Sequence, residues 1–479
     1  MIAANRQYPI ISLFLGGKSK KEALRNMLSE NSPKRLHCGV AVSLHCDLLS
    51  MRSPTPMLFA DSDPLASPVV GQERMPRGAR ELAFNGHVST TDVHYIIYSR
   101  LLVPFVDIVC VFADDFPSLD HVVDFLAECS ARTLPSRPDP VRPRLMIVVN
   151  ANSEGTKESG NEKQWPQQLD PGVLSRAFSA ISIVHAGSSV GRLKRLMTAQ
   201  AEAMHRLRRN HDFLFTATHM AFLFQAAVNH LARSFDEPFD FVSSSRTDGG
   251  VPLAVRDRLS LYRGLCRTEG LPDEVIAQSV ASALIMDYYR PDMPLLDPQL
   301  VFRTFYRAYI AWMPRELDLT EGGWEDLVEA SMIEQFGQLK NTGKSSVELR
   351  RGLMASQSDQ FRRVKSNHLC LYCLFRPAQH PAACGHSLCD LCPQLFGTPA
   401  ADREFYFTVT PCGHCLSPDP LVIDLLPPTM SPTVVAIDGG GVRAVIPLEF
   451  LILVQEHLGK DARLADFVDL GVGTSSGKA

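Results

Sequence analysis

The sequence has no apolar run of the ~18 residues that a membrane-spanning helix needs. Its longest apolar stretch, residues 213–228, contains His219 and Gln225, so we expect a buried helix there. We expect no signal peptide at the N-terminus, because Arg6 and Pro9 precede only a short apolar run. Neither sign of charge dominates, since 48 basic residues face 52 acidic ones. These absences argue against broad nucleic-acid binding and predict a cytoplasmic location.

Cysteine is sparse outside one segment of the chain. Five of the twelve cysteines are scattered, and we expect them to be free, buried thiols: Cys38, Cys46, Cys110, Cys129 and Cys266. The length of 479 residues is too great for one hydrophobic core. We therefore expect a multidomain chain that divides into 8–210, 211–360, 366–418 and 433–479.

Apolar strands alternate with amphipathic helices through the first 210 residues. This alternation predicts a mostly parallel α/β sheet. The candidate strands are Ile10 to Leu15, Val40 to Leu44, Met57 to Ala60, Val106 to Phe112, Leu145 to Val149 and Ile181 to Val184. The candidate helices are Lys20 to Leu28, Val93 to Leu102, Leu119 to Cys129 and Leu193 to Leu207.

The first candidate strand is followed by Gly16, Gly17, Lys18 and Ser19, which open a helix. This is where a phosphate-binding loop stands, because its backbone N–H groups can cradle an anion. Together with the order of strands and helices over residues 8–210, the loop resembles that of a Ras-like P-loop GTPase.

The N-terminal region departs from the pattern of that family in three motifs. Ser12 replaces the first glycine of the loop, and Pro64 replaces the glycine of the magnesium-side motif. Ala151 and Ser153 stand where base recognition needs lysine and aspartate. We therefore favour the interpretation of a degenerate scaffold that binds no nucleotide over that of an active GTPase.

Helical periodicity dominates residues 211–360. Pro272 opens one helix as a first-turn residue, and its apolar stripe comprises Val275, Ile276, Val280, Ala283 and Leu284. We expect a series of aromatic side chains to lie in the core: Phe302, Phe305, Tyr306 and Tyr309. Three arginines lie at the end of the candidate helix Leu193 to Leu207, and we expect them on a solvated face: Arg206, Arg208 and Arg209.

Seven cysteines and one histidine lie close together between positions 370 and 415. The spacing is Cys370-x2-Cys373-x10-Cys384-x-His386-x2-Cys389-x2-Cys392-x19-Cys412-x2-Cys415. Paired thiolates two residues apart suit tetrahedral zinc, and eight ligands make two closed structural sites. The alternatives are a disulfide cluster, which needs an oxidising compartment, and an unrelated zinc knuckle.

The order of these pairs resembles a RING-type zinc finger. That family's cross-brace implies one zinc ion on Cys370, Cys373, Cys389 and Cys392, and a second on Cys384, His386, Cys412 and Cys415. The resemblance also implies a ubiquitin-conjugating enzyme as partner, docked through Leu371, Leu374 and Leu391. Gly413 replaces the proline common between the last two ligands, and Leu416 replaces a cation. A ligase and a purely ordering or docking element therefore both remain open.

A short apolar strand, Val434 to Ile437, leads into Asp438 and three glycines, Gly439, Gly440 and Gly441. Helical spacing over residues 445–458 puts this turn at a helix N-terminus. Unbonded N–H groups and the helix dipole favour an anion there, and in acyl transfer that anion is the tetrahedral oxyanion.

A second motif, Gly473-Thr474-Ser475-Ser476-Gly477, follows the apolar run Phe467 to Val472. Small residues two positions before and after a serine permit the sharp turn that presents a nucleophile. With Arg443 after the glycine turn, the two motifs resemble the start of a patatin-like phospholipase domain. The resemblance implies a three-layer α/β fold, a Ser/Asp dyad with Ser475 as nucleophile, and hydrolysis of a phospholipid or lysophospholipid at a membrane surface.

This segment also departs from its family. Ala444 and Lys478 replace small residues of the two motifs, and the dyad aspartate belongs to a later Asp-Gly segment. We expect the 479-residue chain to be inactive by itself, with the glycine turn and Ser475 too far apart for one carbonyl to contact both. The alternative function is a zinc-dependent interaction protein, or a RING-type ubiquitin ligase, with a relic hydrolase segment.

Overall fold

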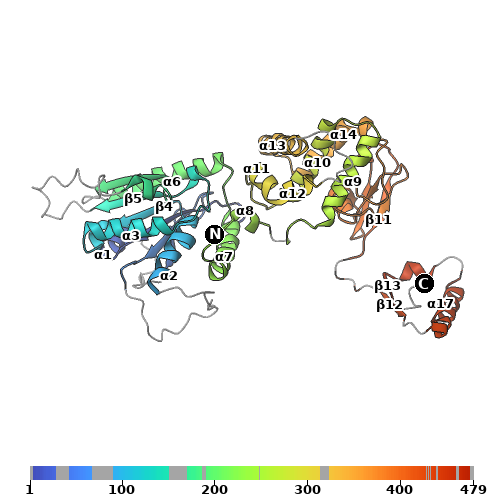
Figure 1. The fold of residues 1–479 in the computed structure, drawn as a ribbon, viewed down its shortest axis with the longest axis horizontal. Helices are drawn as coiled ribbons and strands as arrows, with labels where there is room; N and C mark the ends of the chain where they lie inside the picture. The colour runs from blue at the N-terminus through green and yellow to red at the C-terminus, as the bar shows by residue number, and fades with distance from the viewer. Residues whose placement is uncertain are drawn as a thin grey trace, which may run out of the picture.

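A sheet covered by helices, a helical region with a cysteine-rich module, and a short β-α-β segment follow one another along the chain (Figure 1). The computed structural model describes residues 4–28, 42–66, 90–149, 170–185, 190–246, 249–312, 323–427, 429, 431, 433–437, 441–459 and 463–474. The expected multidomain α/β organisation is confirmed at this level. Within these ranges, no helix combines the length and the apolar character that crossing a membrane requires.

The N-terminal unit is one six-stranded sheet in the order β2-β3-β1-β4-β5-β6. Its strands are β1 Ile10–Leu15, β2 Ser43–Cys46, β3 Met57–Ser62, β4 Ile108–Phe112, β5 Arg144–Val149 and β6 Ala180–His185. All neighbours pair in parallel except β2 and β3. The prediction of a mostly parallel sheet is therefore confirmed, although the second strand starts three residues later than expected.

Helices cover both faces of this sheet. The helical segments are α1 Lys18–Met27, α2 Thr90–Ile96, η1 Ile97–Leu102, η2 Val103–Phe105, η3 Ala113–Asp115, α3 Leu119–Arg132, η4 Asp139–Val141, α5 Pro171–Leu174 and α6 Val190–Asn210. Side chains alternate along β1, so Leu13 and Leu15 pack under η1 and α3 while Phe14 packs under α1 and α6. The carboxyl ends of the parallel strands thus meet the N-termini of helices at one edge.

Arg208, expected on a solvated face, is buried instead. Its guanidinium donates to Asp107 Oδ1 at 2.8 Å, and the other oxygen of that carboxylate accepts from the Ile11 backbone N–H. The ion pair ties the last turn of α6 to the sheet. Arg206 and Arg209 are exposed, as expected.

The helical region begins with an amphipathic helix, α7. Its elements are α7 Ala217–Arg233, α8 Phe241–Ser244, α9 Ala254–Thr268, α10 Asp273–Tyr288, α11 Pro298–Val301, η6 Phe302–Tyr306, α12 Arg307–Ile310, α13 Trp324–Thr342, α14 Ser346–Ser356 and α15 Ser358–Phe361. The expectation of a buried helix over 213–228 is only half right, because Phe222 and Phe224 of α7 are exposed.

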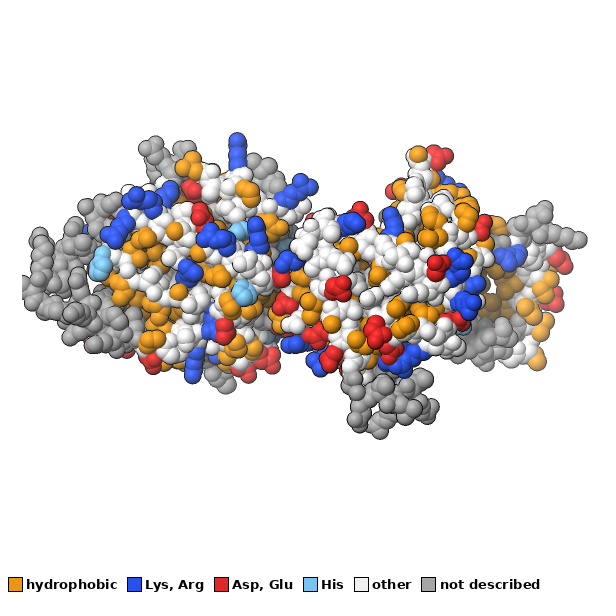
Figure 2. Space-filling model, turned by 90° about the horizontal axis from the view of Figure 1, so that it is seen from above, with side chains coloured by type: hydrophobic (Ala, Val, Ile, Leu, Met, Phe, Trp, Pro, Cys, Tyr) orange, Lys and Arg blue, Asp and Glu red, His pale blue; other side chains and the backbone are white. Residues whose placement is uncertain are grey.

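The described side chains on the face shown in Figure 2 mix basic and acidic groups.

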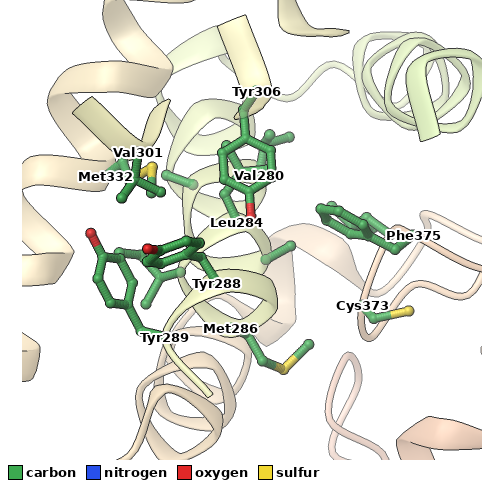
Figure 3. Close-up of a cluster of buried hydrophobic side chains, with 14 of the residues drawn as sticks. Val280, Leu284, Met286, Tyr288, Tyr289, Val301, Tyr306, Met332, Cys373 and Phe375 are labelled. Atoms are coloured by element: carbon green, nitrogen blue, oxygen red, sulfur yellow. The ribbon is translucent and has the colours of Figure 1, made fainter. Parts of the chain in front are cut away.

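Helix α10 is the centre of this region. Pro272 is its N-cap rather than its first helical residue. The predicted stripe is buried except for the half-buried Val275, and residues on the opposite side, such as Ser282 and Met286, are buried as well. A helix that is apolar nearly all round belongs inside a core. Figure 3 shows Val280 and Leu284 of α10 facing Tyr306 and Phe375, which come from η6 and the cysteine-rich module.

The cysteine-rich module has little secondary structure of its own. Its elements are β7 His380–Pro381, β8 Ser387–Leu388, α16 Leu391–Phe396, β9 Thr398–Pro399, β10 Tyr406–Val409 and β11 Leu421–Asp424. Its buried side chains belong to the same hydrophobic core as α10, α13 and α14. The division between 211–360 and 366–418 stays a prediction.

One buried arginine joins the two parts of this shared core. Arg350 of α14 is fully buried and donates to the carbonyl oxygens of Leu371 and Tyr372, at 3.1 and 3.0 Å, in the module. It also donates to the Ser279 carbonyl and, at 3.1 Å, to the Ser279 hydroxyl of α10. Burial lowers the pKa of Arg350.

We expect Arg350→Met to destabilise the helical region and the module together, by roughly 2–5 kcal/mol, because it leaves several buried carbonyl groups without donors. Urea unfolding followed by circular dichroism measures this. The matched control is Arg362→Met, because that side chain is exposed and pairs only locally with Asp359. A loss for Arg350→Met no larger than for the control would contradict the proposed role.

Candidate functional sites

The eight residues of the cysteine-rich module form two groups in space. One group is Cys370, Cys373, Cys389 and Cys392, and the other is Cys384, His386, Cys412 and Cys415. Within each group the potential ligand atoms lie within 4.8 Å of one another. These are the two groups that the cross-brace of the RING resemblance implies.

The sulfur positions fit a tetrahedral metal ion. Zn–S bonds of about 2.3 Å separate tetrahedral sulfur ligands by roughly 3.8 Å. In the first group, the sulfur of Cys392 lies 3.5 Å from that of Cys370 and 3.6 Å from that of Cys389, and Cys373 lies 3.8 Å from Cys389. The Cys370 thiol, followed by those of Cys373 and Cys392, lowers the pKa of Cys389. This group can therefore supply a thiolate to zinc.

Two similar turns present the Cys-x2-Cys pairs at either end of the module. The N–H of Leu374 donates to the Cys370 carbonyl at 2.9 Å, and the N–H of Leu416 donates to the Cys412 carbonyl at 2.8 Å. Both leucines have left-handed backbones, with φ of 63° and 57°. Residues other than glycine rarely adopt this backbone conformation, and it persists where surrounding contacts fix it.

The remaining ligands come from a hairpin and a helix start. Cys384 and His386 flank Gly385, whose φ of +84° closes the turn between β7 and β8. The sulfur of Cys384 lies 3.4 Å from His386 Nδ1, which identifies Nδ1 as the nitrogen that faces the group. Cys389 and Cys392 lie at the start of α16, where the Cys392 N–H donates to the Cys389 carbonyl.

His414 lies beside the second group without belonging to it. Its ring stacks on His386 at 5.3 Å between centroids, and burial lowers its pKa well below the usual range. A neutral imidazole therefore packs against the ligand histidine. His380, in contrast, pairs with Asp390 at 2.6 Å on the surface.

The residues proposed for docking a ubiquitin-conjugating enzyme are mostly inside the protein. Leu371 and Leu374 are fully buried in the core shared with the helical region, whereas Leu391 is exposed. A side chain at Gly413 would meet Met354 of α14 at 2.6 Å, and the Gly413 N–H donates to the Tyr372 hydroxyl at 2.8 Å. Leu371 and Leu374 therefore do not offer the exposed apolar contacts that the RING resemblance implies, whereas docking of a ubiquitin-conjugating enzyme stays a prediction.

The phosphate-loop residues lie between β1 and α1, as the order of elements predicts. Gly17 is the N-cap of α1, and the side chain of Lys18 is exposed. The backbone N–H groups of Gly17 and Ser19 donate to the carboxylate of Asp115. The loop thus binds an acidic side chain of the same chain, a contact that the sequence analysis missed.

The two hydrolase motifs leave neighbouring strands at one edge. The segment comprises β12 Val434–Ile437, η7 Gly441–Ala444, α17 Val445–Leu458, η8 Leu464–Phe467 and β13 Leu470–Gly473. β12 and β13 pair in parallel, with Ile437 opposite Gly473, and the Thr474 N–H donates to the Ile437 carbonyl at 3.3 Å. The strands that precede the two motifs are therefore adjacent, whereas the separation of the glycine turn from Ser475 stays a prediction, because Gly439, Gly440 and Ser475 lie outside the described residues.

Some of the predicted hydrolase residues lie outside the described ranges: Gly439, Gly440, Ser475 and Gly477. Gly441, with φ of +59°, and exposed Arg443 begin the turn into α17. Gly473 ends β13. No described side chain between residues 433 and 474 is buried, so this segment has no core of its own.

The scattered cysteines are free thiols wherever the structure describes them. Cys110, Cys129 and Cys266 are buried, and Cys46 is half-buried. Burial raises the pKa of Cys266 to about 12. Such thiols are unreactive. Cys38 lies outside the described residues.

Comparison with known proteins finds short similarities to plant patatin-like proteins. Patatin-like protein 2 of Oryza sativa, in both the indica and japonica subspecies, is 49% identical over 49 residues, which are 9% of this chain and 12% of the relative. Patatin-like protein 2 of Arabidopsis thaliana is 44% identical over 59 residues, 11% of this chain and 14% of the relative. The chain thus spans about an eighth of the length of these relatives. No family model matches the chain.

Proposed function

We propose that the chain carries the start of a patatin-like serine hydrolase that acts on acyl esters of lipids. The observation that carries this proposal is the parallel pairing of β12 and β13, which directs the glycine turn and the serine turn to the same edge. Adjacent strands lie about 4.8 Å apart, so the two loops start within reach of one ester group. We infer that the patatin-like similarity includes the two motifs within residues 433–479.

The proposed chemistry follows from these two loops. The Ser475 hydroxyl attacks the carbonyl carbon of an acyl ester, and its proton passes to a carboxylate base. N–H groups of Gly439, Gly440 and Gly441 donate to the oxyanion, while Arg443 adds positive charge beside the turn. Collapse of the intermediate expels the alcohol and leaves an acyl-serine that water hydrolyses. Phospholipids and lysophospholipids are the substrate class, met at a membrane surface.

The same segment explains why we assign its activity to a larger unit. Helix α17 is rich in apolar residues, yet Ile446, Leu448 and Phe450 are exposed. A helix of this type belongs inside a layered domain. Two strands without a core cannot hold a nucleophile within the ~0.5 Å that catalysis needs.

We propose further that the cysteine-rich module holds two structural zinc ions. The first would be held by Cys370, Cys373, Cys389 and Cys392, and the second by Cys384, His386, Cys412 and Cys415. The ions supply folding energy rather than chemistry, because four protein ligands leave no open position. The burial of Leu371 and Leu374 favours an ordering role over a ubiquitin ligase.

For the N-terminal unit we propose a scaffold related to Ras-like GTPases. The strand order β2-β3-β1-β4-β5-β6, with β2 antiparallel, supports this relation. The exposed Lys18 and the occupied loop support a scaffold without nucleotide.

Purified, reducing and chelator-free protein should carry two zinc ions per chain by elemental analysis, and Cys384→Ser or His386→Ala should lose metal and unfold the module. Because the module shares its core with α10, hydrogen exchange should also rise in residues 273–288 when the metal is removed.

The control for this experiment is Cys46→Ser, a free cysteine outside the module, which should keep both ions. One ion or none in the wild-type protein would overturn the assignment of two sites. Unchanged protection of α10 in metal-free protein would refute the dependence of the helical region on zinc.

The 479-residue chain should not hydrolyse p-nitrophenyl butyrate, whereas a chain extended through an Asp-Gly segment of the patatin type should. A positioned base contributes about 10²- to 10⁴-fold. In the extended chain Ser475→Ala should abolish turnover, and the neighbouring Ser476→Ala should retain most of it. Turnover by the 479-residue chain that is lost in Ser475→Ala would place a base within these residues.

A further inference from the structure

The N-terminus of α1 already binds an anionic group, the carboxylate of a residue in the same chain. Asp115, in the short helix η3 after β4, accepts three backbone hydrogen bonds there. Its Oδ2 accepts from Gly17 N–H at 2.8 Å and from Lys20 N–H at 2.9 Å, and its Oδ1 accepts from Ser19 N–H at 2.8 Å. A carboxylate in this position satisfies helix donors that otherwise lack partners.

The loop is shaped around this carboxylate. Gly16 has φ of +146°, and a Cβ at this position would lie 2.7 Å from Asp115 Oδ2. Helix α1 has no acidic residue in its first turn. Asp115 is therefore the anion that compensates the positive end of the helix dipole.

A buried cation lies on the other side of the same turn. Lys20 is fully buried, and its ammonium lies 2.6 Å from Asp61 Oδ1 and donates to the Ser62 carbonyl at 2.9 Å. Asp61 and Ser62 end β3, in register with Phe14 and Leu15 of β1. His45 Nε2 lies 3.6 Å from the second oxygen of Asp61. The acidic residue at the end of β3 is thus neutralised by the protein itself.

We propose that Asp115 is a built-in substitute for a nucleotide phosphate at this loop, and that Lys20 substitutes for a divalent cation beside Asp61. The proposal rests on the relation of this unit to P-loop proteins and goes beyond it, because it names the group that occupies the loop. A tethered carboxylate competes with free ligands at an effective concentration in the millimolar range or above. Phosphate compounds must displace it before they bind.

The test uses the full 479-residue chain, and inorganic phosphate and pyrophosphate as probes. In Asp115→Ala, hydrogen exchange at the amides of residues 17–20 should rise roughly tenfold or more, because each of three amides loses a charged acceptor. Phosphate or pyrophosphate should restore protection in the variant and leave the wild-type protein unchanged. Titration calorimetry of the wild-type protein with magnesium-GTP should show no micromolar binding.

Asp124→Ala is the matched control, because it removes an exposed carboxylate from α3 without touching the loop. If Asp115→Ala does not fold, Asp115→Asn keeps the shape and removes the charge, and the same amides must still exchange faster than in the wild-type protein. Unchanged exchange, or no recovery with either probe, overturns the proposal. Micromolar GTP binding by the wild-type protein overturns both this proposal and the proposed nucleotide-free scaffold, whereas failure of the phosphate rescue alone leaves the scaffold intact.

Discussion

The buried guanidinium of Arg350 connects the cysteine-rich module to the helical region. The carbonyl groups of Leu371 and Tyr372 belong to the turn that presents Cys370 and Cys373, and Ser279 belongs to the central helix α10. A fully buried arginine without a carboxylate partner is tolerated only where every donor is used. The same side chain therefore contacts both the turn that presents Cys370 and Cys373 and the helical core.

Internal partners also govern the loop between β1 and α1. There an aspartate holds the backbone donors and a lysine neutralises Asp61. The cysteine-rich module follows the same pattern, because its apolar first turn packs on α10 and α14. In both units, residues that the sequence analysis assigned to a ligand or a partner contact other parts of the same chain instead.

The strands, the parallel sheet, the helical middle and the spacing of the cysteine groups could be predicted because each depends on local patterns. Arg350, Arg208 and Asp115 could not. Arg208 lies on the buried face of α6 with Ala201 and Met204, but its partner, Asp107, is 101 positions away in the sequence and is brought to it by the fold. Asp115 is 98 positions from Gly17, so their contact depends on β4 lying beside β1. The parallel pairing of β12 and β13 depends likewise on the helix between them.

The shared core also limits where the hydrolase segment can lie. Leu425 is buried in the core that contains the cysteine-rich module, and β12 begins at Val434. The eight residues between them, 426–433, cannot place the start of β12 more than about 30 Å from Leu425. The burial of Leu425 therefore limits how far the start of β12 can lie from the core that contains the cysteine-rich module, although no residue of either cysteine group belongs to the strand pair.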